Sequence, residues 1–128
     1  MIETQVFYRC PICGNIIGMI NDAGVTPVCC GQPMEKLTAN TVDAAVEKHV
    51  PVITQKDRMI TVTVGEMPHP MTDEHFISWI YLQTSCGGHR RILKPGDDAE
   101  ACFCLCEGES PIRVFSYCNI HGLWTADC

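Results

Sequence analysis

The stretch MITVTV, residues Met59–Val64, indicates the fold of most of this chain. Ile60, Val62 and Val64 alternate with two threonines, and this period of two is typical of a β-strand that buries one face. The sequence therefore predicts an extended segment here, with its aliphatic side chains directed into a core.

Further short apolar runs follow this stretch and are separated by turn-forming residues. The runs are FISWIYL, RRIL, ACFCLC and IRVFSY, and the turn signals between them are SCGGH, KPGDD and EGESP. About seven short strands in about 80 residues predict an antiparallel β-sandwich of immunoglobulin type. The pattern requires no helix.

A different composition precedes the sandwich. Residues 1–37 are rich in glycine, proline and cysteine, and a unit this short seldom folds without a metal, disulfides or a partner. Residues 38–48 are polar and without clear periodicity, so we interpret them as a linker with the first loop of a site. The sequence thus predicts a mostly β protein with a small metal-binding domain over 1–37 and a sandwich over 49–128.

Two cysteine pairs in the front segment have the spacing of a metal site. CPIC contributes Cys10 and Cys13, and VCCGQPM contributes Cys29 and Cys30. Such pairs suit a tetrathiolate site, which either zinc or iron accepts, so a zinc staple and a one-electron iron site both remain open. The second pair is adjacent, unlike that of a zinc ribbon, and predicts a distorted site.

The net charge and the cysteine content indicate which binding partners and which cellular compartment to expect. The net charge is -6 and the pI about 5.2, which predicts no general attraction for nucleic acid or anionic membranes. The sequence shows no pattern of a signal peptide and no apolar run of membrane-helix length, so we expect a cytoplasmic protein. Ten cysteines in a reducing compartment indicate metal binding or redox chemistry more than disulfides.

A second metal site is indicated by YCNIHGLW, residues 117–124. Cys118 and His121 lie in one tight turn, and Gly122 lets the chain leave it without strain. Three more histidines fall at strand ends or in loops, namely His49, His69 and His75. A blue-copper site uses two histidines and one cysteine, whereas this larger set of imidazoles with one thiolate favours iron.

These stretches resemble one family when they are taken together and in order. YRCPICGN, VCCGQPM, EKHVPV, HPM followed by EH, LKPGD and YCNIHGLW span nearly the whole chain. They resemble the desulfoferrodoxin family, the two-iron form of superoxide reductase, and the front pairs match its small desulforedoxin-like domain, which is similar to rubredoxin.

The resemblance implies a set of ligands and an activity. The four front cysteines would hold a rubredoxin-like iron. A second iron would lie in a plane of imidazoles with an open sixth position, its ligands being His49, His69, His75, His121 and, on the axis, Cys118. The activity would be the reduction of superoxide by one electron and two protons to hydrogen peroxide.

The resemblance also implies roles for Glu47 and Lys48 and for two partners. Lys48 would attract superoxide or organise its protonation, and Glu47 would occupy the sixth position when the iron is ferric. A small electron donor such as rubredoxin would supply the electrons, and the protein would be a homodimer. Two other classes stay open: a two-iron electron carrier without turnover, and a zinc-stapled interaction module.

Some residues have no place in either site. We expect His89 to be solvent-exposed. The period of two places three cysteines of CFCLC on one strand face, and we interpret them as small apolar residues of the core, against the alternative of a further metal or redox site. The five cysteines outside both sites are Cys86, Cys102, Cys104, Cys106 and Cys128.

Overall fold

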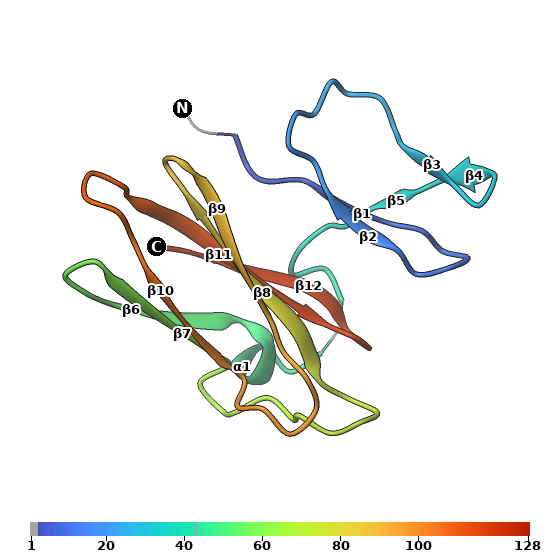
Figure 1. Ribbon diagram of the computed structural model, residues 1–128. Helices are drawn as coiled ribbons and strands as arrows, with labels where there is room; N and C mark the ends of the chain where they lie inside the picture. Colours follow the sequence, from blue (N-terminus) through green and yellow to red (C-terminus); the bar gives the residue numbers. More distant parts are fainter. Residues whose placement is uncertain (1–2, 43) are drawn as a thin grey trace. The chain divides into compact units, whose positions relative to one another are not determined.

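The structure is a computed structural model that describes residues 3–42 and 44–128. The chain divides into two compact units, Met1–Thr38 and Ala39–Cys128 (Figure 1). The front unit contains the four-cysteine motifs, and the second contains all the histidines.

The front unit consists of short strands around a very small core. One sheet has the order β2-β1-β5, and β3 pairs with β4 in a second, two-stranded sheet. Among the described residues, its buried cluster consists of Tyr8, Cys10 and Met34, with Val6, Met19 and Cys29 packed against it, so little apolar surface stabilises this unit. The strands are β1 (Phe7–Arg9), β2 (Ile16–Gly18), β3 (Val28–Cys29), β4 (Gln32–Pro33) and β5 (Glu35–Lys36).

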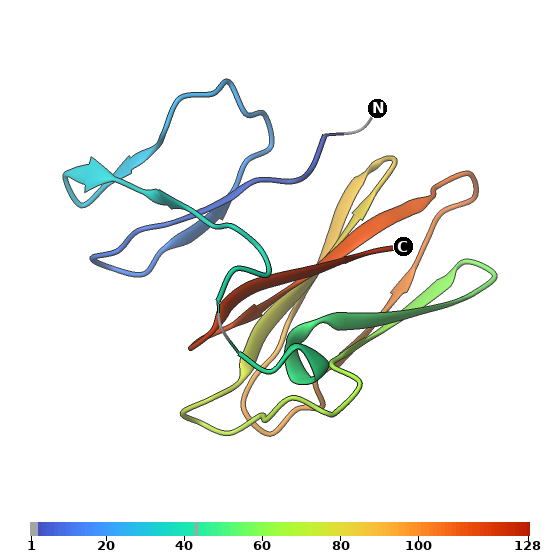
Figure 2. The same ribbon diagram turned by 180° about the vertical axis from the view of Figure 1, so that it is seen from behind.

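The second unit is an antiparallel sandwich of two sheets (Figures 1 and 2). The sheets have the orders β10-β7-β6 and β12-β11-β8-β9, which confirms the predicted mostly β fold. The strands are β6 (Pro51–Lys56), β7 (Met59–Val64), β8 (Ile77–Thr84), β9 (Gly87–Ile92), β10 (Glu100–Cys104), β11 (Pro111–Cys118) and β12 (Gly122–Asp127).

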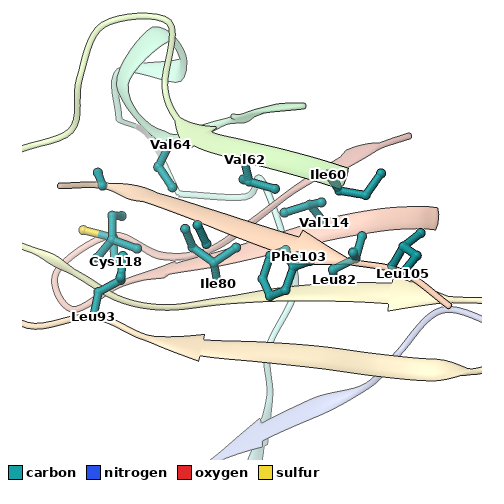
Figure 3. Close-up of a cluster of buried hydrophobic side chains, with 13 residues drawn as sticks. Ile60, Val62, Val64, Ile80, Leu82, Leu93, Phe103, Leu105, Val114 and Cys118 are labelled. Atoms are coloured by element: carbon teal, nitrogen blue, oxygen red, sulfur yellow. The ribbon is translucent and has the colours of Figure 1, made fainter. Parts of the chain in front are cut away.

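The core of the sandwich lies between the facing sheets, as Figure 3 shows. Ile60, Val62 and Val64 of β7 are fully buried, as their alternation predicts. Ile80 and Leu82 of β8 meet them from the other sheet. Cys118 belongs to the same cluster (Figure 3), so the thiol at the end of β11 is fixed by the hydrophobic core itself.

One short helix departs from the expectation that the chain forms none. α1 (Val46–His49) is a single turn at the end of the sandwich where the loop between β7 and β8 also lies (Figures 1 and 2). The Met67 N–H donates to the Glu47 carbonyl at 2.9 Å, which ties this loop to α1. The helical turn is stabilised by this tertiary hydrogen bond to the Glu47 carbonyl. The periodicity of the local sequence does not predict such a contact.

The outward cysteines of β10 contradict the expectation that they pack in the core. Ala101, Phe103 and Leu105 are buried, whereas the alternate residues Cys102, Cys104 and Cys106 are exposed. The prediction of one shared face is therefore correct, and the choice of face is wrong. The larger phenylalanine and leucine side chains bury more apolar area than thiols and occupy the core.

His89 also differs from its expectation. Its side chain is half-buried, and its Nε2 lies 2.9 Å from the Glu109 carboxylate. The side chain of Glu109 is only 5% exposed, because the turn between β10 and β11 folds over this end of β9. The histidine was expected in solvent because nothing in its local sequence identifies Glu109 as a partner.

Within the described residues, 3–42 and 44–128, no helix has the length and apolar character needed to cross a membrane.

Candidate metal centres

The four front cysteines converge on one point. Their sulfurs all lie within 4.8 Å of one another, and the Sγ of Cys29 is 3.7 Å from that of Cys13 and 4.0 Å from that of Cys30. Sulfurs bound tetrahedrally to one ion at about 2.3 Å lie about 3.8 Å apart. The arrangement therefore has the dimensions of a tetrahedral metal site.

The adjacent pair is accommodated by an unusual backbone conformation. Cys30 has a φ of 53°, and Gly31 after it has a φ of 76°. A left-handed residue turns its side chain away from the alternation of an extended strand, so two neighbouring thiols can face the same ion. The sequence predicts a distorted site from this adjacent pair, and the structure shows an unusual backbone conformation at Cys30.

The thiols of the cluster shift one another's pKa values in opposite directions. The Cys13 N–H, 3.5 Å from the Cys10 sulfur, lowers the pKa of the Cys10 thiol to about 6. The neighbouring sulfurs, Cys13 first, raise the pKa of Cys30 to about 12. The protein alone thus stabilises the Cys10 thiolate and disfavours the Cys30 thiolate, whereas a bound metal ion would favour the thiolate form of each of its ligands.

Four imidazoles form a ring in the second unit. Neighbouring rings of His49, His69, His75 and His121 have centroids 4.6–5.0 Å apart and are nearly perpendicular, with interplanar angles of 78–82°. The opposite pair His49 and His75 is farther apart, at 6.2 Å. This is a four-membered cycle, so the predicted planar set of imidazoles has assembled.

Hydrogen bonds determine which nitrogens point inward. The Nδ1 atoms of His49 and His69 each lie 2.7 Å from a backbone carbonyl, of Ala45 and Pro70 respectively. A carbonyl only accepts, so both Nδ1 atoms carry the proton and both Nε2 atoms of the neutral rings present lone pairs. These two lone pairs face each other across 3.1 Å, which is repulsive unless a cation lies between them.

The other two imidazoles complete the set. His121 directs Nδ1 inward, 3.0 Å from the Nε2 of His49, and the Nε2 of His75 is buried without a hydrogen-bond partner. Ligand nitrogens at right angles about one ion, each about 2.1 Å from it, lie about 3.0 Å apart, whereas tetrahedral ones would be about 3.4 Å apart. The observed spacings of 3.0 and 3.1 Å favour the square arrangement.

Burial favours the neutral form of three of these rings, those of His49, His69 and His75. It lowers the pKa of His69 to about 4, and it lowers the pKa of His49 and His75 as well, with neighbouring imidazoles adding to the effect. Neutral imidazole is the form that coordinates a cation.

The thiol of Cys118 lies against this ring. Its Sγ is fully buried and is 3.8 Å from the Nδ1 of His121. The His121 N–H points at the same sulfur at 3.4 Å, which confirms the tight turn predicted around these residues. Gly122 has a φ of 78°, a left-handed conformation that glycine adopts without strain, as expected for this exit from the turn.

Asn119 holds the separate loops in place, and sequence reasoning missed it. Its side-chain amide donates to the Glu74 carbonyl and accepts from the Phe76 N–H, both at 2.9 Å, so it brackets His75 from either side. An asparagine between two ligands in a tight turn is the signal that points to this role. Through Asn119 the turn of Cys118 positions a ligand that is 43 residues earlier in the chain.

Glu47 and Lys48 are exposed on α1 beside the ring. Burial and the neighbouring imidazoles lower the pKa of His75, and the Lys48 ammonium contributes in the same direction, as it does for His49. Glu47 lines a hollow of about 310 Å³ together with Glu66 and Val50. The positive charge therefore acts on two of the four imidazoles from the solvent side.

Comparison with known proteins agrees with this geometry. The sequence matches the family described as Desulfoferrodoxin over residues 41–127 and the family described as Desulfoferrodoxin, N-terminal domain, over residues 2–37. The chain belongs to the desulfoferrodoxin family. The resemblance inferred from its motifs is thereby confirmed.

Individual desulfoferrodoxins are similar along the whole chain. The Syntrophotalea carbinolica desulfoferrodoxin is 48% identical over 127 residues, 99% of each chain. A desulfoferrodoxin homolog of Methanothermobacter thermautotrophicus is 47% identical over 97% of this chain and 99% of its own. The crystal structure of the superoxide reductase from Treponema pallidum has a TM-score of 0.83 at 31% identity, covering 98% of this chain and all of that one.

Proposed function

We propose that this desulfoferrodoxin is a superoxide reductase that carries iron in both sites. Superoxide takes up one electron and two protons and leaves as hydrogen peroxide. When bound, the iron of the second site supplies the electron. The observation that carries this proposal is the pair of imidazole lone pairs of His49 and His69, which are 3.1 Å apart in a ring of imidazoles against which the buried thiol of Cys118 lies.

The protein supports this reaction by bringing the donor atoms together from separate loops. The ligands of the second iron are proposed to be His49, His69, His75, His121 and Cys118, and those of the first are proposed to be Cys10, Cys13, Cys29 and Cys30. The N–H of His121 directed at the Cys118 sulfur stabilises the thiolate and so adjusts the potential of the site.

Lys48 and Glu47 are proposed to act at the open face of the second site. Lys48 is exposed, and its charge reaches His49 and His75, so it is placed to attract an anion that the net charge of -6 would otherwise repel. It also offers a donor for the oxygen that receives a proton. Glu47 is proposed to close this face in the oxidised protein, and its proximity to His49 supports that role.

The same proposal assigns a role to each segment of the chain and includes an electron donor and a second copy of the protein as partners. Residues 1–37 form the desulforedoxin-like domain, 38–48 the linker with the first site loop, and 49–128 the catalytic domain. A small donor such as rubredoxin supplies electrons in the cytoplasm. A homodimer is supported by the exposed aliphatic side chains of the front unit, including Ile12, Ile20, Val25 and Val28.

Metal analysis with spectroscopy and pulse radiolysis tests the proposal. We expect two irons per chain, thiolate-to-iron absorption bands, and a change in the bands of the second site on adding azide. Cys118→Ser should remove those bands and slow the reaction with superoxide, whereas Cys128→Ser, at an exposed cysteine outside both sites, should behave as wild type.

Other outcomes identify the alternative classes. A colourless zinc protein would contradict the proposal and favour a structural module. Two irons that do not respond to azide would identify an electron carrier with a saturated second site.

A further inference from the structure

The outer face of β10 and the segment directly after it carry a row of sulfur atoms that neither iron site uses. Cys102, Cys104 and Cys106 are all exposed with free thiols, and Met59 on β7 is 45% exposed. Cys104 and Met59 are direct partners in the ladder between the two strands, so the thioether belongs to the same face. We call these four residues the sulfur face.

The hydrogen bonding of the ladder brings Met59 and Cys104 close together. The Leu105 N–H donates to the Arg58 carbonyl and the Val64 N–H to the Ala99 carbonyl, so the inward residues form the hydrogen-bonded pairs. The outward pairs are then the non-hydrogen-bonded ones, whose Cα atoms lie about 4.5 Å apart with side chains in contact. Thr61 and Cys102, an equivalent pair, agree with this, since their Oγ1 and Sγ atoms are 3.6 Å apart.

Neighbouring thiols along β10 are badly placed for a disulfide. Alternate residues of a strand lie about 6.6 Å apart with parallel Cα–Cβ bonds, whereas a disulfide needs Cβ atoms about 3.8 Å apart. A metal ion relaxes this requirement, because two sulfurs on opposite sides of it are separated by about 4.6 Å. Small rotations of two neighbouring thiols toward each other meet that distance.

The donor set selects the kind of ion. Thiolate and thioether ligands favour soft cations, and Cu(I) is satisfied by two or three sulfurs without the loop geometry that a tetrahedral zinc site needs. β10 is the edge strand of its sheet as the described residues form it, and the thiols of Cys102 and Cys104 are exposed, so an ion can reach them from solvent. We propose that the sulfur face binds Cu(I), with the Cys104 and Cys102 thiolates as ligands and the Met59 thioether as the third.

The test is a competition for Cu(I) between the iron-loaded protein and the chelator bathocuproine disulfonate, without oxygen. We expect the wild-type protein to withdraw copper from the chelator while its iron content and visible bands stay unchanged. X-ray absorption at the copper edge should show sulfur neighbours only. Cys104→Ser should abolish this binding, and Met59→Leu should weaken it by about 10-fold, the order typical of a supporting contact.

The matched control is Cys128→Ser, which removes an exposed thiol at the end of the chain and should bind copper as wild type does. Because Cys104 is exposed, its replacement by serine leaves the fold intact, and the unchanged iron bands verify this in the same sample. Three outcomes would overturn the proposal: no competition by the wild type, equal binding by Cys104→Ser, or copper uptake only in exchange for iron of the tetrathiolate site. None of them depends on whether the second iron reduces superoxide.

Discussion

The imidazole of His49 stacks on the indole of Trp124, with ring centroids 4.8 Å apart and planes inclined by 30°. Trp124 is almost fully buried in β12, and the Ser116 hydroxyl donates to the His49 carbonyl at 3.3 Å. The ligand is thus held by the hydrophobic core on one side and by α1 on the other. A rigid ring of imidazoles binds metal more tightly because its side chains lose little conformational entropy on binding.

Replacing Trp124 by leucine should weaken the second iron site. The His49 ring loses its aromatic support, so we expect iron affinity there to fall by about 10-fold. The free energy of unfolding should also fall by about 2–4 kcal/mol because of the cavity left behind. Trp79→Leu is the matched control, since Trp79 stacks on Tyr117 of β11 and should cost stability without loss of iron. Equal iron loss in both variants, measured by chelator competition, would contradict a role for the stack.

Gly65→Ala should damage the site through α1. Gly65 has a φ of 84°, and a Cβ there would lie 2.7 Å from the Glu47 carbonyl oxygen and 2.5 Å from that of Met67. Gly96 has a similar φ of 92° but no atom within 4 Å of its Cβ position, so Gly96→Ala isolates the cost of the backbone conformation, about 1–2 kcal/mol. We expect Gly65→Ala to cost more than this in urea unfolding and to lower the iron content of the second site. If both variants lost the same free energy of unfolding, the loop after Gly65 would be able to move away from α1 without cost.

Lys48→Ala should slow the reaction with superoxide by about 10-fold and reduce its dependence on ionic strength, because a local cation that attracts the anion is lost. Pulse radiolysis over a range of salt concentrations measures both effects. Lys48→Arg should retain most of the rate, and Lys56→Ala, at an exposed lysine of β6, should behave as wild type. An unchanged rate in Lys48→Ala would remove this residue from the mechanism.

Glu109 should make stability depend on pH in the acid range. Hydrogen bonds from the Thr84 hydroxyl, the Cys106 N–H and His89 lower its pKa from the ordinary value of 4.5 to about 2. The unfolded chain therefore binds the proton more readily, and the stabilisation present above pH 4.5 is lost as the pH falls toward 2.

The comparison is between wild type and Glu109→Gln in urea unfolding from pH 7 to pH 3. The difference in their free energies of unfolding should shrink as the pH falls. Glu107→Gln, at an exposed neighbour in the same turn, should show no such trend. A difference that stays constant with pH would mean that the carboxylate is not stabilised in the fold.

Removing metal from the tetrathiolate site should unfold the front unit alone. The buried cluster that its described residues form is small, consisting of Tyr8, Cys10 and Met34, and Cys10 is one of the four thiols proposed to bind the metal. Segments below about 40 residues seldom fold without such a staple. Hydrogen exchange after chelation should show loss of protection in β1 and β2, while β8 and β11, which share a long ladder over the sandwich core, remain protected. Protection that persists in β1 would show that the strands suffice.

Local patterns predicted much of this protein because their physical causes are local. The alternation in Met59–Val64 selects a strand and its buried face, and the spacing of Cys10 and Cys13 suits a single ion. The same logic was insufficient for ACFCLC. Alternation divides its residues into two faces, but cysteine is as apolar as alanine, so the pattern alone does not say which set is buried.

The sequence by itself determined the strand-rich character of the second unit and the tetrathiolate motif, and the resemblance of its motifs to one family indicated the histidines and the cysteine that gather there. Only the tertiary structure decided that His49 and His69 present Nε2 and His121 presents Nδ1, and that Asn119 brackets His75. It also decided that the thiols of β10 face solvent. The reason is that each of these outcomes depends on a partner many residues away, and such a partner is identified only once the two sheets have packed.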